Sequence, residues 1–416
     1  MKKLLVLYIV LIGYINGSYP HPVFGENGMV VSTSRQASIA GIEILKKGGN
    51  AIDAACATGF VLAVTSSSNG NIGGGGFMVV HKENSKNFTL DYREIAPAAA
   101  HRDMFLDSNG EVIDNMSLRT RAASGVPGSV DGLLKAWKDH GSGNISRREL
   151  LVSAIALAER GFELTDYEAK RFNNNKDLFL NNNAAAKIFI RGDRKPWKAG
   201  DRFIQKDLAR TLKRIAREGR NGFYTGKTAD LIIAEMNRGI GLITHEDLLN
   251  YESKYRDPMI GSFKEYEIIS MGLPSSGGTI LIEMLNMLEN FSLSELGWNS
   301  SEYIHLLTEV ERRAYADRAE HLGDADFWTP PLSMLTSKKY AIDRMNDFYA
   351  DKATSSTVIF AGDPSDYESP ETTHYSVIDK DGNAVSVTTT INLGYGGGFL
   401  VAVSYTHLTL PTNREV

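Results

Sequence analysis

Residues 371–390 read ETTHYSVIDKDGNAVSVTTT, and their pattern predicts a β-hairpin. Apolar and polar residues alternate through His374–Asp379 and again through Ala384–Thr390, as in strands with one buried face. The turn between them, KDGN, contains Asp-Gly, a dipeptide that tight hairpin turns favour. The first strand opens with two adjacent threonines, Thr372 and Thr373. Either both threonines are present only because threonine favours β-strands, or one of the two hydroxyls is a nucleophile.

The rest of the chain mixes short strands with helices. The first helix, over about 36–47, is predicted because apolar residues recur at helical spacing before a Gly-Gly pair. A small-residue helix follows over about 51–64, and residues 148–320 read as largely helical apart from one strand. This order predicts an α+β fold with helices outside a sheet. The other predicted strands are Met29–Thr33, Phe77–His81, Phe88–Tyr92 and YEIISM at 266–271.

Composition restricts the function classes. The chain has 416 residues, of which 42% are hydrophobic and 23% charged, as in one large or two medium globular domains. The net charge of −5 gives no support for nucleic-acid binding. Cys56 is the single cysteine and lies in an apolar run, so we expect a buried structural thiol. The sequence contains no CxxC or HExxH pattern, and we expect neither a metal nor another cofactor.

The first 18 residues, MKKLLVLYIVLIGYINGS, have the form of a secretory signal peptide. Two lysines precede an apolar run from Leu4 to Ile15, and small residues follow it. That run is shorter than the roughly 20 residues that a membrane span needs. We therefore expect removal near Gly17 or Ser18, and a secreted or periplasmic protein with no membrane span.

A threonine at a strand start suits a self-cleaving precursor. Its hydroxyl attacks the preceding carbonyl, the chain breaks, and the threonine gains a free amine. Such an amine has a pKa of about 7.7–8.0, so at neutral pH it can act as base for its own hydroxyl. His374 is no easy base for Thr373, because neighbours on a strand face opposite sides.

Three further features have two interpretations each. Arg93, just past a strand, either forms a local ion pair or binds a carboxylate with its planar fork. The glycines at 73–76 lack the Lys-Ser/Thr of a phosphate loop, and favour close approach of another layer or a substrate. In PSSGG (274–278), Ser275 or Ser276 either caps the following helix or helps bind an anion, and the cap is favoured.

A set of motifs in one order makes a more specific pattern: GGNAIDAA, GNIGGGGFM, LDYREIAP, SGVPGSVDG, PSSGG, AYADRAEHLGD and TTHYSVIDKDGNAVSVTTTIN. Over about residues 28–399 this set resembles the γ-glutamyltransferases, also called γ-glutamyltranspeptidases or glutathione hydrolases. The resemblance implies an N-terminal-nucleophile hydrolase with a four-layer αββα sandwich. It also implies a precursor that is cut into a large and a small subunit.

The resemblance assigns roles to particular residues. It places the cut between Glu371 and Thr372 and makes Thr372 the nucleophile. Thr390 matches the family threonine that hydrogen-bonds the nucleophile, and Asn392 matches a substrate-contacting asparagine. Arg93 matches the arginine that holds the α-carboxylate of the γ-glutamyl group.

The implied reaction uses glutathione and other γ-glutamyl compounds. Thr372 attacks the γ-amide carbonyl and forms a γ-glutamyl ester. Water, or an acceptor amino acid or dipeptide, then resolves that ester. Two alternatives stay open: a related acylase acting on cephalosporin, glutaryl or poly-γ-glutamate substrates, and a non-catalytic secreted relative. The combination of Thr372, Thr390, Asn392 and Arg93 argues against the second.

These inferences divide the chain into a signal peptide (1–18), a large-subunit region (19–371), the start of a small-subunit region (372–402) and a tail (403–416). The tail contains VSYTHLTLPT, which resembles the translation of a sequencing adaptor, and we interpret it as non-native. The family's small subunit continues much further and supplies the oxyanion-hole glycines, a paired-serine motif and an acidic residue for the substrate amine. We therefore expect a truncated chain that neither matures nor turns over substrate as written.

Overall fold

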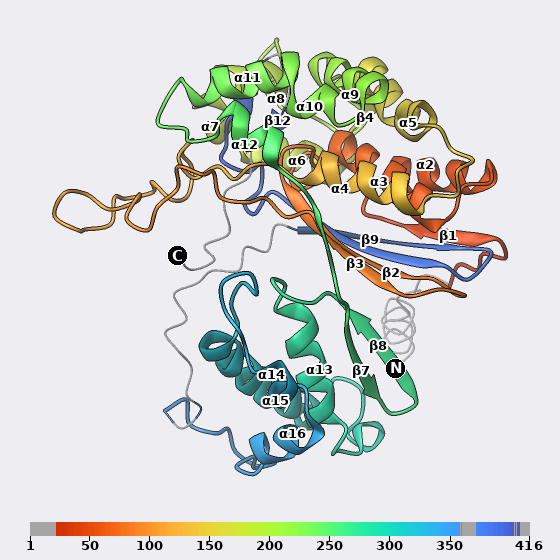
Figure 1. Ribbon diagram of the computed structural model, residues 1–416, viewed down its shortest axis with the longest axis vertical. Helices are drawn as coiled ribbons and strands as arrows, with labels where there is room; N and C mark the ends of the chain where they lie inside the picture. The colour runs from red at the N-terminus through yellow and green to blue at the C-terminus, as the bar shows by residue number, and fades with distance from the viewer. Residues whose placement is uncertain (1–21, 358, 360–371, 403, 405, 408–416) are drawn as a thin grey trace, which may run out of the picture.

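A computed structural model describes residues 22–357, 359, 372–402, 404 and 406–407. The predicted signal peptide and Glu371 lie outside the described residues. The central feature is a six-stranded, fully antiparallel sheet in the order β1-β9-β10-β2-β3-β6 (Figure 1). Its strands are β1 (Gly28–Val31), β2 (Gly75–His81), β3 (Phe88–Asp91), β6 (Lys254–Arg256), β9 (Thr372–Asp379) and β10 (Ala384–Thr390).

The predicted hairpin is confirmed and lies inside the sheet. β9 pairs with β10 from Thr372 opposite Thr390 to Ile378 opposite Ala384. Along β9, Tyr375 and Val377 are buried while His374 is exposed, as the predicted alternation requires. The carboxylate of Asp379 closes the turn, since Oδ1 accepts from the backbone N of Asp381 at 3.0 Å. Its Oδ2 accepts from the backbone N of Ala51 at 2.9 Å, which joins the hairpin to a helix start.

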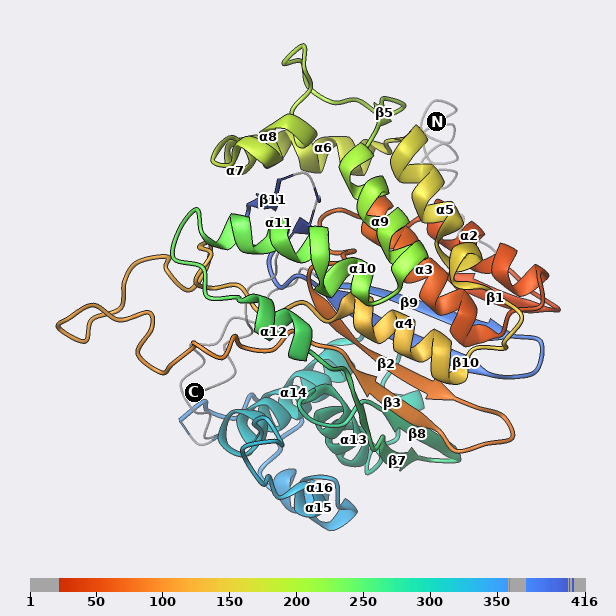
Figure 2. The same cartoon turned by 45° about the horizontal axis from the view of Figure 1, so that its top comes forward.

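Three helices cover one face of the sheet (Figure 2): α2 (Arg35–Lys46), α3 (Ala51–Thr65) and α4 (Ser129–His140). Every residue of α3 is buried, and Cys56 is confirmed as a buried thiol. Burial raises the pKa of that thiol, which keeps it protonated and unreactive. A Cβ on Gly59 would stand 2.7 Å from Tyr375 Oη, so this glycine lets α3 lie directly on β9.

An outer helical layer lies over α2–α4 (Figures 1 and 2). Phenylalanine rings from several of these elements stack together; Phe179 and Phe189, for example, have ring centroids 4.4 Å apart. The elements are α5 (Arg147–Arg160), β4 (Phe162–Glu163), α6 (Asp166–Asn174), α7 (Lys176–Leu180), α8 (Asn183–Phe189), β5 (Arg202–Phe203), α9 (Lys206–Glu218), α10 (Asn221–Tyr224), α11 (Gly226–Met236) and α12 (His245–Asn250). The short strands β11 (Leu400–Val401) and β12 (Thr406–His407) pair with each other.

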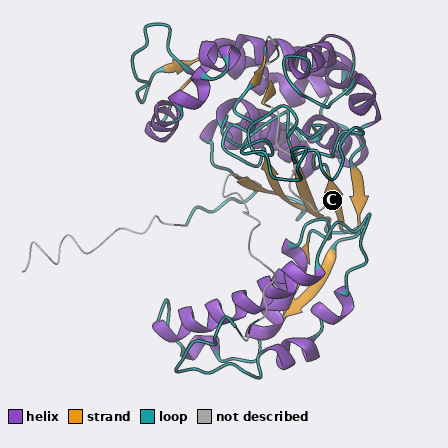
Figure 3. Cartoon of the chain, turned by 90° about the vertical axis from the view of Figure 1, so that its left-hand side faces the viewer, coloured by secondary structure: helices purple, strands orange, loops and turns teal. Residues whose placement is uncertain are grey.

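A lobe lies on the other side of the sheet from α2–α4 (Figures 1 and 3). The prediction of YEIISM as a strand is confirmed, and residues 148–320 are largely helical as expected, but that interpretation missed the short strands β4, β5, β6 and β7. β6 is a three-residue, mostly exposed edge strand, and β7 forms a two-stranded ribbon with β8. The lobe comprises β7 (Met259–Phe263), β8 (Tyr266–Ser270), α13 (Gly277–Leu288), η1 (Leu293–Glu295), α14 (Ser301–His321), α15 (Leu332–Leu335) and α16 (Lys338–Arg344).

One buried asparagine fixes where β10 ends. Asn71 lies between α3 and β2 and is 5% exposed. Its Oδ1 accepts from Gly74 N at 2.8 Å and from the Ser129 hydroxyl at 2.7 Å. Its Nδ2 donates to Thr390 O at 2.9 Å and to Thr389 Oγ1 at 3.1 Å. A single side chain thus connects the glycine run, the start of α4 and the last residues of β10.

The lobe contains a buried pair of carboxyl groups. Glu283 on α13 is 1% exposed and lies within hydrogen-bonding reach of Asp317 on α14. Burial first, and then the hydrogen bond and charge of Asp317, raise the pKa of Glu283 to about 10. Asp317 in turn accepts from Arg344 Nε at 2.8 Å. At neutral pH Glu283 therefore stays protonated beside the carboxyl group of Asp317.

We expect Glu283→Gln to make the stability of the lobe less dependent on pH. The folded-state pKa of Glu283 is raised, so its favourable contribution is complete below the unfolded pKa near 4.5 and is lost as pH rises towards about 10. Glutamine keeps the neutral hydrogen-bonding shape. Each pH unit above 4.5 corresponds to about 1.4 kcal/mol, so the variant should be more stable than the wild type by up to about 5 kcal/mol at pH 8 and by little at pH 4.5. Thermal unfolding across pH measures this, with the exposed Glu265→Gln as control; parallel pH profiles would refute it.

We expect Asn71→Ala to lower the free energy of unfolding by about 3 kcal/mol or more. It leaves several buried groups without a partner, and each such group costs about 1–3 kcal/mol. Urea unfolding provides the measurement. The control is Asn237→Ala at an exposed position, expected within about 0.5 kcal/mol of wild type. Equal midpoints for the two variants would show that Asn71 does not hold the end of β10.

Candidate functional site

The end of the sheet brings three separate chain segments into one row. Thr372, the first residue of β9, lies opposite Thr390 at the end of β10. Thr390 lies opposite Gly75 at the start of β2 on its other side. The next row contains Thr373, Thr389 and Gly76. Strand register alone therefore places the two threonines that the sequence singled out next to each other.

Thr390 and Asn392 form a turn just past β10. The Thr390 hydroxyl accepts from the backbone N of Asn392 at 2.9 Å. Asn392 has a φ of +62°, a backbone conformation that asparagine tolerates better than most residues. This turn directs the Asn392 amide towards the chain that follows β3. There, Asn392 Oδ1 accepts from Arg93 Nη2 at 3.0 Å and Nδ2 donates to Glu94 Oε1 at 3.2 Å.

Arg93 and Glu94 form an ion pair at this corner. Arg93 Nη2 lies 2.9 Å from Glu94 Oε1, and Arg93 Nε lies 3.3 Å from Glu94 Oε2. The Glu94 side chain is fully buried, whereas the Arg93 side chain is 15% exposed. The backbone holds the same geometry, because Tyr251 Oη donates to Arg93 O at 2.8 Å. The local ion pair considered from the sequence is thus present, and a neutral amide shares the guanidinium with it.

The glycine run permits this close packing. A Cβ on Gly75 would stand 2.5 Å from Glu94 Oε2, and one on Gly74 would stand 2.4 Å from Thr390 O. The backbone N atoms of Gly128 and Ser129 both donate to Gly74 O, at 2.8 and 3.0 Å. The expectation that these glycines allow close approach of another layer is confirmed. Their backbone serves strand and loop contacts.

The two residues after Thr372 face opposite sides of β9, as expected. Thr373 is 2% exposed, and its hydroxyl lies 3.1 Å from that of Thr33. His374 is exposed, with Nδ1 3.0 Å from Thr388 Oγ1 and Nε2 within 3.3 Å of the Ser376 and Ser386 hydroxyls. Partial burial lowers the pKa of His374, which favours a neutral ring at neutral pH.

The expected serine cap of α13 is only partly right. Ser276 occupies the N-cap position, but its φ and ψ are helical and its side chain makes no capping bond. Its hydroxyl instead accepts from Arg318 Nε at 3.0 Å. The serine therefore connects α13 to α14.

Two residues of the site were missed by reasoning from the sequence. Glu94 was noted only as the neighbour of Arg93, although an acidic residue directly after a candidate carboxylate-binding arginine is a usable signal. Asn71 lies in a polar loop, and nothing local distinguishes it from Asn69. Across the described part of the chain, no group of three or more His, Cys, Asp or Glu side chains could hold a metal ion. No described helix is long and apolar enough to cross a membrane.

Comparison with known proteins gives a consistent family. The model of the gamma-glutamyltranspeptidase family matches residues 37–404. The "Glutathione hydrolase proenzyme" of Escherichia coli (strain K12) is 42% identical over 384 residues, which cover 92% of this chain and 66% of the relative. The chain thus spans slightly less than two thirds of that relative's length.

Solved structures agree with the sequence comparison. The crystal structure of Helicobacter pylori gamma-glutamyltranspeptidase has a TM-score of 0.79 at 42% identity, covering 84% of this chain and 100% of that one. A cephalosporin acylase from Bacillus halodurans has a TM-score of 0.80 at 24% identity, covering 95% of this chain and 72% of that one, which shows a shared fold alone. Together with the match over residues 37–404, these likenesses show that the chain belongs to the gamma-glutamyltranspeptidase family.

Proposed function

We propose that this protein is the precursor of a glutathione hydrolase that cuts itself before Thr372 and then uses Thr372 as its nucleophile. The observation that carries the proposal is the row formed by Thr372 and Thr390, with Asn392, Arg93 and Glu94 linked by hydrogen bonds just beyond it. The named function of the Escherichia coli and other proenzymes supports it. Glu371, on the other side of the proposed cut, lies outside the described residues.

Self-cleavage would proceed through an ester. The Thr372 hydroxyl adds to the carbonyl carbon of residue 371, and the bond from that carbon to the Thr372 nitrogen breaks. The nitrogen takes up a proton and becomes a free amine, while the acyl group rests on the hydroxyl oxygen. Water hydrolyses this ester, giving a carboxylate at residue 371 and restoring the Thr372 hydroxyl.

In the mature enzyme the new amine would be the base. It accepts the hydroxyl proton of Thr372 as the oxygen attacks the γ-amide carbonyl of glutathione, and later donates a proton to the leaving cysteinylglycine amine. Water then hydrolyses the γ-glutamyl ester, or an amino acid or dipeptide takes over the γ-glutamyl group. Thr390 would position the attacking oxygen through the row that it shares with Thr372.

Arg93 would bind the α-carboxylate of the γ-glutamyl group. Its guanidinium is partly exposed and oriented by the buried Glu94, and one of its partners is the neutral amide of Asn392. A carboxylate is a stronger acceptor than an amide, so a substrate could take that place without leaving a buried charge unpaired. Glu94 would act as a positioning residue for both Arg93 and Asn392.

The wider architecture is part of the same proposal. Residues 19–371 would form the large subunit and the chain from Thr372 onwards would belong to the small subunit, in a four-layer αββα sandwich. The protein would be secreted or periplasmic after removal of residues 1–18. The six-stranded sheet with helices over one face supports one half of such a sandwich.

Thr372→Ala should abolish both the cut and the hydrolysis of γ-glutamyl compounds in the full-length precursor, because it removes the attacking oxygen. Thr372→Ser keeps a hydroxyl and should retain measurable cutting and activity. Mass spectrometry for a fragment that begins at residue 372, together with an assay of glutathione hydrolysis, provides the test. A cut and active Thr372→Ala protein would disprove the assignment of the nucleophile.

Arg93→Lys should raise KM for a γ-glutamyl amide by about 10- to 100-fold, as expected when a charged hydrogen-bonding contact worth about 1.5–3 kcal/mol is lost. The internal control is the matching 4-aminobutanoyl amide, which lacks the α-carboxylate. Its already weak turnover should change little in the variant. If KM rose by the same factor for both substrates, Arg93 would be supporting the structure of the site and not binding the carboxylate.

A further inference from the structure

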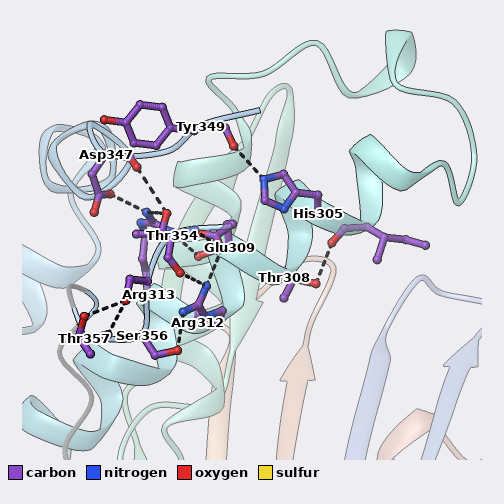
Figure 4. Close-up of polar contacts among 12 residues, drawn as sticks. His305, Thr308, Glu309, Arg312, Arg313, Asp347, Tyr349, Thr354, Ser356 and Thr357 are labelled. Carbon is purple, nitrogen blue, oxygen red and sulfur yellow. Dashed lines mark hydrogen bonds and ion pairs between the residues drawn. The ribbon is translucent and has the colours of Figure 1, made fainter. Parts of the chain in front are cut away.

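A charged network in the lobe lies away from the candidate site (Figure 4). Helix α14 presents Glu309, Arg312 and Arg313 to the chain segment 347–357, which follows α16. We call these three side chains the α14 clamp. The segment they hold is described without a gap up to residue 357, and Thr372 follows later in the sequence.

Arg313 uses its whole guanidinium in this clamp. Nε donates to Arg344 O at 2.8 Å, and Nη1 donates to Glu309 O at 3.0 Å and to Glu309 Oε2 at 2.6 Å. Nη2 donates to Asp347 Oδ1 at 2.5 Å and to Thr354 Oγ1 at 3.1 Å. These contacts match the five donors of an arginine, and the side chain is only 1% exposed. No donor is left for a ligand, so the site is built to hold the protein's own chain.

Thr354 is held through every polar group it has. Its backbone N donates to Glu309 Oε1 at 3.2 Å, and its carbonyl accepts from Arg312 Nη1 at 2.9 Å. Its hydroxyl accepts from Arg313 Nη2. Two residues later, the Ser356 hydroxyl accepts from Arg312 Nη2 at 3.0 Å. The hydroxyl of Thr357, in contrast, lies 2.8 Å from that of Ser355 within the segment itself.

We propose that the α14 clamp is the docking site that keeps the end of the large-subunit chain on the lobe after the cut before Thr372. The inference rests on the proposed self-cleavage. In the uncut precursor the segment is tethered at both ends, by α16 and by β9. The cut removes the second tether, and the clamp contacts then decide whether residues 347–357 stay on α14 or become a mobile tail open to proteolysis.

The sizes of the expected effects distinguish docking after the cut from a role in promoting the cut. The last described residue before β9 is Ile359, which is 5% exposed. Loss of the clamp in the precursor would move the last such anchor of the chain before β9 back from about residue 359 to about residue 345, just after α16. Loop-closure cost grows only with the logarithm of length, so the rate of cutting should fall by about two- to threefold. After the cut, loss of a charge-assisted hydrogen bond directly weakens docking of the segment on α14. We expect the docking equilibrium constant to fall about tenfold.

The test measures hydrogen exchange of the 347–357 segment before and after the chain is broken. The precursor carries Thr372→Ala, and a recognition sequence for a site-specific protease is placed within residues 360–371. The chain then folds intact and is cut on demand, independently of self-cleavage. Thr354→Val removes the hydroxyl held by Arg313, and Thr357→Val is the matched control on the same segment.

With the clamp intact, cutting should change exchange of the segment by less than threefold, and Thr357→Val should behave in the same way. Thr354→Val should exchange about two- to threefold faster before the cut and at least tenfold faster after it. Arg313→Lys, which keeps the charge but loses the fork, should show the same pattern, with exchange of α14 itself as the check that the lobe is folded. Tenfold faster exchange of the unmodified segment on cutting, or equal responses of Thr354→Val and Thr357→Val, would overturn the inference.

The outcome is independent of the proposed function. A full-length precursor with native Thr372 that never cuts itself would refute the self-cleavage, while the protease-cut protein would still decide whether the clamp holds a broken chain.

Discussion

The pairing of β9 between β1 and β10 is the constraint on which the candidate site depends. Residues of β9 alternate between the helix-covered face and the open face, so a slip by one residue would bury His374 and expose Tyr375 and Val377. The register is held at both ends of the hairpin. Asp379 joins the turn to the start of α3, and Asn71 holds the carbonyl of Thr390. With these ends fixed, Thr372 can only lie opposite Thr390.

Much of this arrangement could be predicted from the sequence, because its signals are local. Alternation with an Asp-Gly turn identified β9 and β10, and an uninterrupted run of small and apolar residues identified α3. β6 was not predicted because Lys254–Arg256 is a short edge strand, whose exposed residues need no alternation of apolar and polar side chains. The burial of Glu94 and the hydrogen bonds of Asn71 depend on segments hundreds of residues away, such as Asn392 and Thr390. No window of sequence contains both partners.

The fold by itself does not choose the substrate. A cephalosporin acylase shares it at 24% identity, so the same layers support different acyl groups. What distinguishes a substrate must lie in the side chains beyond the end of the sheet. The corner formed by Arg93, Glu94 and Asn392 offers one oriented, partly exposed guanidinium, which suits an anionic group better than an apolar acyl chain.

Two arginines of the molecule differ in how easily they could exchange one of their partners. Arg313 is 1% exposed and gives all five donors to protein acceptors, so an exchange of partners there would leave a carboxylate or a carbonyl buried and unbonded. Arg93 is 15% exposed, and its contacts run through Nε and Nη2 to one carboxylate and one neutral amide. Giving up an amide for a ligand carboxylate costs one ordinary hydrogen bond and gains a charged one. An arginine that must exchange partners in each catalytic cycle needs such a replaceable contact, and an arginine that must hold the chain needs none.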